Sequence, residues 1–167
     1  GADQHIIYEH RQAEADALLE QAELVICTDF NDPKRIGSLG EKMLSLTCKK
    51  MMIDHHLFPA DFPDLTISYP ACPSTCELVY RLITCLSPIS DSRSPITEEI
   101  ATCIYTGMMT DTGNFSFNSN YAEMYQIVGD LVAAGVNKDA IYNRVFNAYS
   151  ADRMRLMGYC LYQKMKI

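Results

Sequence analysis

Apolar positions in this chain form two kinds of pattern, short unbroken runs and longer segments with helical spacing. Residues 24–28 and 51–53 are short apolar runs that each end in a polar cluster, and residues 39–47 between them have helical spacing. The short runs predict buried strands, and the segment between them predicts a helix. Strand, helix and strand in this order, with polar residues after each strand, are typical of parallel α/β structure.

Helical spacing and turn residues predict the rest of the chain. Residues 9–21 are rich in Glu, Ala, Gln and Leu, which favour helix. Three prolines between 59 and 70 predict a loop that contains a short strand at 65–69, and a second loop rich in Ser and Pro is predicted at 87–95. Further helices are predicted at 74–86, 97–109, 122–134, 138–147 and 151–164.

Capping residues mark two of these helix starts. Ser74 is expected to cap the helix that follows it, with Glu77 three residues later as its capping-box partner. Thr97 is expected to start the next helix, and Gly113 is placed to stop it. That helix is apolar almost all round, with Cys103 among its apolar residues, so it should be buried.

These elements predict an α/β fold with a central, mainly parallel sheet and helices on both faces. The chain, residues 1–167, is long enough for a single domain with its own core. Its last helix runs into the C-terminus without a cap or a breaker, and its first residues lack a clean element start. We therefore expect one domain that is truncated at both ends relative to a longer protein.

Composition and charge narrow the classes of function. Hydrophobic residues make up 48% of the chain and charged residues 21%, as in ordinary globular proteins. No apolar stretch approaches the roughly 20 residues of a membrane span, and no signal-peptide pattern begins the chain, so no membrane partner is expected. The net charge of −7 argues against binding to duplex nucleic acid, but not against a small phosphate ester beside a bound cation.

The seven cysteines are scattered, odd in number and without a CxxC pair. Several lie inside apolar segments, which predicts reduced and mostly packed thiols in a cytoplasmic protein. Cys72 and Cys76 are four positions apart and resemble half of a zinc site. Because Pro73 lies between them and no second pair is nearby, we predict no zinc site there.

Three polar clusters, at 28–31, 54–56 and 110–113, carry the candidate chemistry. Functional groups gather outside the carboxyl ends of the strands in an open parallel sheet. Two clusters are predicted to lie there, and a buried helix can bring the third to the same edge. Carboxylates with imidazoles suit Mn²⁺, Mg²⁺, Fe²⁺ or Zn²⁺, and a carboxylate can bridge two ions that activate water for phosphoryl transfer.

The same clusters resemble the motifs of a known family. The Asp-His-His tripeptide at 54–56, after an apolar strand, is the motif that names the DHH phosphoesterases. Residues 25–31, with Arg35 following, resemble the family's second motif, and residues 105–115 resemble its fourth. Residues 74–80 resemble a helix start of the same family. Because these motifs run in order over nearly the whole chain, it is identified as a member of the DHH phosphoesterase family, with the fold of the N-terminal domain.

The branch that the chain resembles most is that of the bacterial oligoribonucleases and phosphoadenosine-phosphate phosphatases, often called nanoRNases. The resemblance implies that Asp29 bridges two Mn²⁺ ions and that His55 and Asp111 are further metal ligands. It also implies that His56 contacts the phosphate and that Asp54 orients an imidazole. Each of these residues, taken alone, also fits a turn, a cap or a surface loop, but their joint order disfavours that alternative.

Two residues of the second motif have open roles. Arg35 either clamps a phosphate or is a solvated arginine. Asn31 either orients a nucleotide or supports its turn. With His56 they form the predicted substrate-binding set, and His56 and Arg35 are the candidate catalytic residues. His5 and His10 belong to no motif and are interpreted as surface residues.

The resemblance predicts an Mn²⁺-dependent enzyme, with Mg²⁺ as an alternative, that hydrolyses short single-stranded oligonucleotides or small nucleotides such as phosphoadenosine phosphate. A homodimer is compatible with it. Inorganic pyrophosphatase or cyclic-dinucleotide phosphodiesterase activity on the same fold, or a non-catalytic nucleotide-binding module, are the alternatives. The family's first motif, a His followed by Pro-Asp-x-Asp, is expected upstream of residue 1, and its small substrate domain after residue 167.

Overall fold

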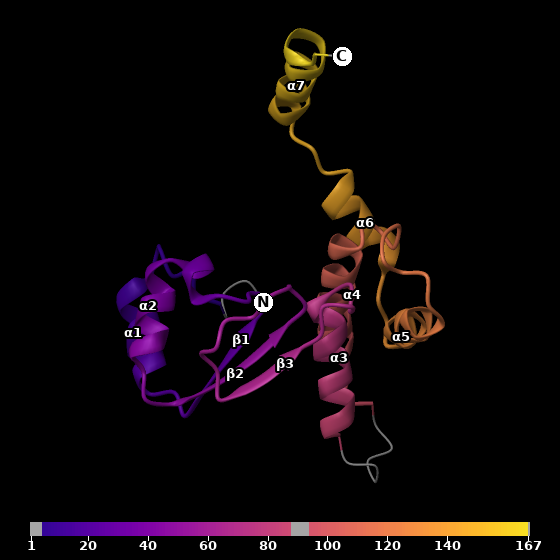
Figure 1. The fold of residues 1–167 in the computed structure, drawn as a ribbon. Helices are drawn as coiled ribbons and strands as arrows, with labels where there is room; N and C mark the ends of the chain where they lie inside the picture. Colours follow the sequence, from indigo (N-terminus) through magenta and orange to yellow (C-terminus); the bar gives the residue numbers. More distant parts are fainter. Residues whose placement is uncertain (1–4, 88–93, 167) are drawn as a thin grey trace.

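A parallel three-stranded sheet forms the centre of the structure, a computed structural model that describes residues 5–87 and 94–166 (Figure 1). All strand pairs are parallel, which confirms the predicted α/β fold. The predicted loop at 87–95 falls largely on residues 88–93, which lie outside the described residues. In spatial order the strands are β1 (Leu24–Thr28), β2 (Lys49–Asp54) and β3 (Leu65–Ser68).

The α-helices occur in the predicted order and differ from prediction mainly at their ends, where boundaries are least sharply defined. The short 3₁₀-helix at Pro33–Ile36 was not predicted. The last predicted helix is divided, because its final part is a π-helix rather than an α-helix. The elements are α1 (Gln12–Glu20), η2 (Pro33–Ile36), α2 (Ser38–Ser45), α3 (Thr75–Leu86), α4 (Glu98–Asp111), α5 (Ala122–Ala133), α6 (Lys138–Phe146), α7 (Ala151–Tyr159) and η3 (Cys160–Lys164).

Helices cover both faces of the sheet, as predicted. Successive residues of a strand point to opposite faces, so Met52 and Ile53 of β2 face different helices. Met52 packs with Cys27 and with Met43 of α2, whereas Ile53 packs with Leu78 of α3. In Figure 1, α1 and α2 accordingly lie on one side of the sheet and α3 on the other.

A larger apolar core lies among α4, α5 and α6. It contains Ile104 and Met108 of α4, Leu131 of α5 and Ile141 of α6. The prediction that α4 is buried almost all round was wrong at Cys103, whose side chain is exposed because the other helices cover only part of the α4 surface. α7 has no buried residue and extends away from the other elements in Figure 1.

The start of α3 differs in one respect from the prediction. Ser74 is the N-cap, and its hydroxyl accepts a hydrogen bond from the Cys76 backbone N–H at 3.1 Å. Glu77 is not its capping-box partner, because the Glu77 carboxylate is buried and accepts hydrogen bonds from Arg81 and Tyr121 instead. A tertiary contact has therefore displaced the local capping pattern.

All seven cysteines are free thiols, as predicted. The prediction that they are mostly packed was wrong, because only Cys27 and Cys72 are buried and three of the seven are exposed. His5 and His10 are exposed, in agreement with their interpretation as surface residues. Within residues 5–87 and 94–166, no helix combines the length and the apolar character needed to cross a membrane.

Gly40 allows a test of the packing that positions the segment after β1. A Cβ at Gly40 would lie 2.1 Å from the Pro33 carbonyl oxygen, and backbone cannot move aside as a side chain can. Gly40→Ala should therefore lower the free energy of unfolding, measured by urea denaturation, by about 1–3 kcal/mol. Gly129→Ala in α5 meets no atom within 4 Å and should be neutral or stabilising by up to about 1 kcal/mol. Equal stability of the two variants would contradict the packing described.

Candidate functional site

The register of β1 against β2 brings the first two polar clusters together. Thr28 pairs with Ile53, and the Asp29 N–H donates to the Ile53 carbonyl at 3.1 Å, which continues the ladder one residue beyond β1. Asp29 then turns the chain with a φ of 65°, a left-handed conformation that Asp tolerates better than most residues. Asp29 and residues 54–56 consequently lie at the same carboxyl edge of the sheet.

Three side chains of these clusters converge. Asp29, His55 and His56 each offer one ligand atom, and these atoms all lie within 4.8 Å of one another. His55 Nε2 is 3.6 Å from Asp29 Oδ1, and the two imidazole rings meet edge to face. The three side chains are all partly open to solvent, so they are accessible to an ion or a substrate. Two imidazole nitrogens and a carboxylate oxygen form a donor set for a divalent transition metal.

Both histidines are held through Nδ1, by different acceptors. The Nδ1–H of His55 donates to the Cys72 carbonyl at 3.1 Å, because a carbonyl can only accept. The Nδ1–H of His56 donates to Asp54 Oδ1 at 2.7 Å, and the His56 backbone N–H donates to Asp54 Oδ2 at 3.0 Å. Asp54 is fully buried. Both rings therefore have Nε2 available for a ligand, the arrangement that outer partners impose on metal-binding histidines.

Asp111 lies near this group but outside it. It is the last residue of α4, it is exposed, and among the described residues it does not come within the 4.8 Å that joins the other three. Burial raises the pKa of the Cys76 thiol, and the negative charges of Asp111 and Asp29 raise this pKa further. Both carboxylates thus act on one thiol at the start of α3.

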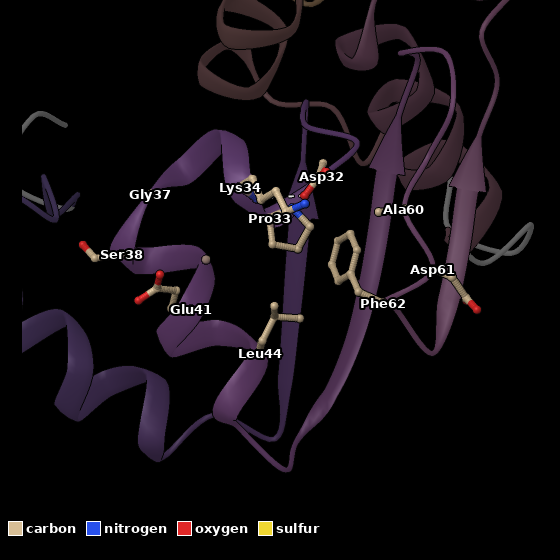
Figure 2. A pocket seen from close by; sticks show the side chains of 11 residues that line it. Asp32, Pro33, Lys34, Gly37, Ser38, Glu41, Leu44, Ala60, Asp61 and Phe62 are labelled. Atoms are coloured by element: carbon tan, nitrogen blue, oxygen red, sulfur yellow. Dashed lines mark hydrogen bonds between the residues drawn. The ribbon is translucent and has the colours of Figure 1, made fainter.

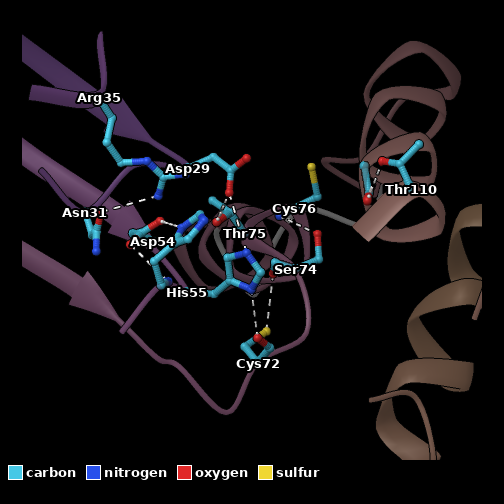
Figure 3. A network of polar contacts seen from close by, with 12 residues as sticks. Asp29, Asn31, Arg35, Asp54, His55, Cys72, Ser74, Thr75, Cys76 and Thr110 are labelled. Atoms are coloured by element: carbon cyan, nitrogen blue, oxygen red, sulfur yellow. Dashed lines mark hydrogen bonds and ion pairs between the residues drawn. The ribbon is translucent and has the colours of Figure 1, made fainter. Parts of the chain in front are cut away.

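Asn31 supports the loop that follows the Asp-His-His tripeptide, and Arg35 contacts Asn31. Asn31 Nδ2 donates to the Leu57 carbonyl at 2.7 Å, and the Ala60 N–H donates to the Asn31 carbonyl at 2.7 Å. Arg35 Nη1 donates to Asn31 Oδ1 at 3.4 Å, as Figure 3 shows. The Asn31 side chain thus supports the backbone of this loop, and the exposed Arg35 lies beside it.

Comparisons with known proteins identify the family of the chain. The model of the DHH family, N-terminal domain, matches residues 3–108, which include Asp29 and residues 54–56. The chain belongs to the DHH family. Asp111 lies just beyond the matched part of this DHH chain.

Relatives of this DHH chain are longer than it is. It is 33% identical over 137 residues to the bifunctional oligoribonuclease and PAP phosphatase NrnA of Thermus thermophilus, covering 82% of this chain and 39% of that protein. An uncharacterized protein of Mycoplasma pneumoniae is 26% identical over 87% of this chain and 42% of its own length. The crystal structure of an exopolyphosphatase-related protein from Bacteroides fragilis has a TM-score of 0.92 and 46% identity, covering all of this chain and 48% of the other. The chain thus spans less than half of the length of each.

Two contacts of the DHH site could not be read from the sequence. The Cys72 carbonyl that orients His55 is a backbone group 17 residues away. The Thr75 hydroxyl donates to Asp29 Oδ1 at 2.9 Å across 46 residues. Only the resemblance of residues 74–80 to a family helix start pointed to this segment. Figure 3 shows Thr75, Asp29 and His55 next to one another above the start of α3.

A polar network fixes the start of α3 beneath the site. Arg81 donates to Glu77 Oε1 through Nε at 2.9 Å and through Nη2 at 2.6 Å, and Tyr121 donates to the other oxygen of Glu77. Burial and the Glu77 carboxylate raise the pKa of the Tyr121 phenol, so Tyr121 remains a donor at neutral pH. These groups and Cys72 border a cavity of about 460 Å³.

A second cavity, of about 560 Å³, lies on the α2 side of the sheet (Figure 2). None of the predicted site residues is among the described residues that line it. It adjoins the site through Ala60, whose N–H donates to the Asn31 carbonyl, and through Asp32 and Lys34, the chain neighbours of Asn31 and Arg35. Its lining residues are Asp32, Pro33, Lys34, Gly37, Ser38, Gly40, Glu41, Leu44, Ala60, Asp61 and Phe62.

Asp54 can be tested as the group that holds His56. Asp54→Asn replaces one acceptor oxygen with an amide N–H₂, so one of the two part-buried hydrogen bonds to His56 is lost or requires the other ring tautomer. We expect a loss of about 1–3 kcal/mol in the free energy of unfolding. Urea denaturation measures this loss, and nitrogen chemical shifts of the His56 ring should show a changed tautomer. The matched control is Asp32→Asn, because Asn caps a helix start as well as Asp does. A loss no larger than that of the control would show that Asp54 does not hold His56.

Proposed function

We propose that this DHH protein is an Mn²⁺-dependent phosphoesterase that hydrolyses short single-stranded oligonucleotides or small nucleotides such as phosphoadenosine phosphate. The convergence of Asp29, His55 and His56 within 4.8 Å at the carboxyl edge of the sheet carries the proposal. Membership of the DHH family and the activity that the name of the Thermus thermophilus relative gives support it.

The donor set favours Mn²⁺ over Mg²⁺. Imidazole nitrogen and carboxylate oxygen together suit first-row transition metals, whereas Mg²⁺ prefers oxygen ligands alone. In the proposal Asp29 and His55 hold the metal, and Asp111 at the end of α4 adds a further carboxylate. Asp54 acts behind His56, since both of its oxygens are bound to that residue.

Bound divalent cations would activate water and offset negative charge on the phosphoryl group. His56 is proposed to direct Nε2 at a phosphoryl oxygen, with its ring fixed by the buried Asp54 carboxylate. Arg35 is proposed as a second phosphate contact. Its exposed guanidinium donates one N–H to Asn31, and its other N–H groups are proposed to donate to the phosphate. Asn31 positions the loop that begins at Leu57 beside the substrate.

The net charge of the chain and the name of one relative bear on the class of substrate. The net charge of −7 disfavours the binding of duplex nucleic acid, which supports our proposal of a small or single-stranded substrate. A second candidate is inorganic polyphosphate, which the name of the exopolyphosphatase-related relative suggests. Hydrolysis rates of the complete protein on short RNA, phosphoadenosine phosphate, pyrophosphate, polyphosphate and a cyclic dinucleotide would separate these candidates.

Two substitutions test the proposed ligands in the complete protein. Asp29→Ala and His55→Ala should each lower Mn²⁺-dependent hydrolysis of the best substrate by more than about 100-fold. Loss of a group that merely orients a ligand already costs about 10- to 100-fold, and a ligand should cost more. A steady-state assay with Mn²⁺ in excess measures the effect.

His10→Ala and Asp152→Ala remove the same kinds of group from exposed positions and should leave the rate unchanged. Activity close to that of the wild type in both ligand variants would refute the assigned roles. Hydrolysis by the wild type that persists at full rate after removal of divalent metal would refute the metal dependence.

A further inference from the structure

We infer that Thr75 is a positioning residue, which holds the Asp29 carboxylate in the orientation that the metal site needs. The Thr75 hydroxyl donates to Asp29 Oδ1 at 2.9 Å, and the same oxygen lies 3.6 Å from His55 Nε2. The inference rests on the proposed function, because it concerns the carboxylate that would hold the cations. Thr75 itself reaches no substrate, since its side chain is almost fully buried behind Asp29.

Asp29 needs such a partner because, in the described part of the chain, no other hydrogen bond fixes its carboxylate. The backbone of Asp29 is held by its bond to Ile53, but the terminal torsion of an aspartate is intrinsically broad. Its side chain is 54% exposed, so packing does not restrict it either. Among the residues that the structure describes, Thr75 is the one hydrogen-bond donor to this carboxylate. One oxygen is thereby fixed beside His55, and the second stays available to a ligand.

Thr75 is well suited to hold another group in place. It is the first residue of α3, a 12-residue helix that packs on the sheet, and it is only 3% exposed. Its β-branched side chain has a stiff χ1 torsion. Ser74 already caps the helix through its own hydroxyl, so the Thr75 hydroxyl is not required for capping. The bond to Asp29 therefore links a rigid helix start to the loop after β1.

The test removes this hydroxyl with little change in volume. In the complete protein, Thr75→Val should weaken Mn²⁺ binding by about 10- to 100-fold, the usual loss when a partner of a metal ligand is removed. Electron paramagnetic resonance of free Mn²⁺ measures the dissociation constant. Thr75→Ser, which keeps the hydroxyl, should restore most of the affinity. Thr84→Val is the matched control, because the Thr84 hydroxyl binds only backbone carbonyls of α3, and it should bind Mn²⁺ as the wild type does.

A metal titration of the hydrolysis rate separates positioning from stability. For Thr75→Val we expect the Mn²⁺ concentration at half-maximal rate to rise by the same factor as the dissociation constant, while the rate at saturating Mn²⁺ approaches that of the wild type. The unfolding temperature of the metal-free variant should stay close to that of the wild type. If Thr75→Val does not fold, Thr75→Ala removes the same hydroxyl with less bulk and replaces it.

Three results would overturn the inference. Wild-type affinity in Thr75→Val would do so and would leave the proposed function intact. A lower unfolding temperature of the metal-free variant, with activity that excess Mn²⁺ does not restore, would make the role of Thr75 structural. A wild type that neither binds Mn²⁺ nor shows Mn²⁺-dependent hydrolysis would refute the proposed function itself, and the inference with it.

Discussion

The pairing of β1 with β2 determines where the groups of the site lie. In the observed register Cys27 pairs with Met52, and both side chains are buried against α2, while Ile53 is buried against α3. A slip of one residue would turn these apolar side chains to the wrong faces, at a large cost in buried surface. The same register places Asp29 beside the residues that follow Ile53. The burial of these apolar side chains thus determines the geometry of the polar site.

The start of α3 is the second determinant of the site. Residues 72–75 supply the carbonyl that orients His55, the cap of the helix and the hydroxyl that binds Asp29. Glu77 fixes this segment by binding Arg81 and Tyr121, the residue just before α5. Burial of a carboxylate is costly unless its oxygens are well satisfied, and here both are. The network therefore connects the sheet side of the molecule with the helical core that contains α5.

Sequence patterns predicted the elements and the clusters, but not the bonds between them. The apolar runs of β1 and β2 and the polar residues after them have a local signature, because strand burial and strand ends both act on neighbouring residues. The Thr75 hydroxyl and its Asp29 partner are 46 residues apart, and the pairing depends on how α3 packs. The spacing of Glu77 from Ser74 fits a capping box. Its carboxylate instead accepts a hydrogen bond from Tyr121, 44 residues away, which the local pattern does not predict. Local pattern fails where a tertiary partner competes for the same group.

The two histidines show how neighbouring residues of one motif become chemically different. Both offer Nε2 to the site, but His55 is held by a neutral carbonyl and His56 by a buried carboxylate. A carbonyl fixes the tautomer without adding charge, which fits a ring that gives its lone pair to a cation. The Asp54 carboxylate also accepts from the His56 backbone N–H, so it fixes both the ring and the backbone of His56. The proposed division between metal ligand and phosphate contact is compatible with these two partners, but it comes from the family resemblance of the tripeptide and stays a proposal.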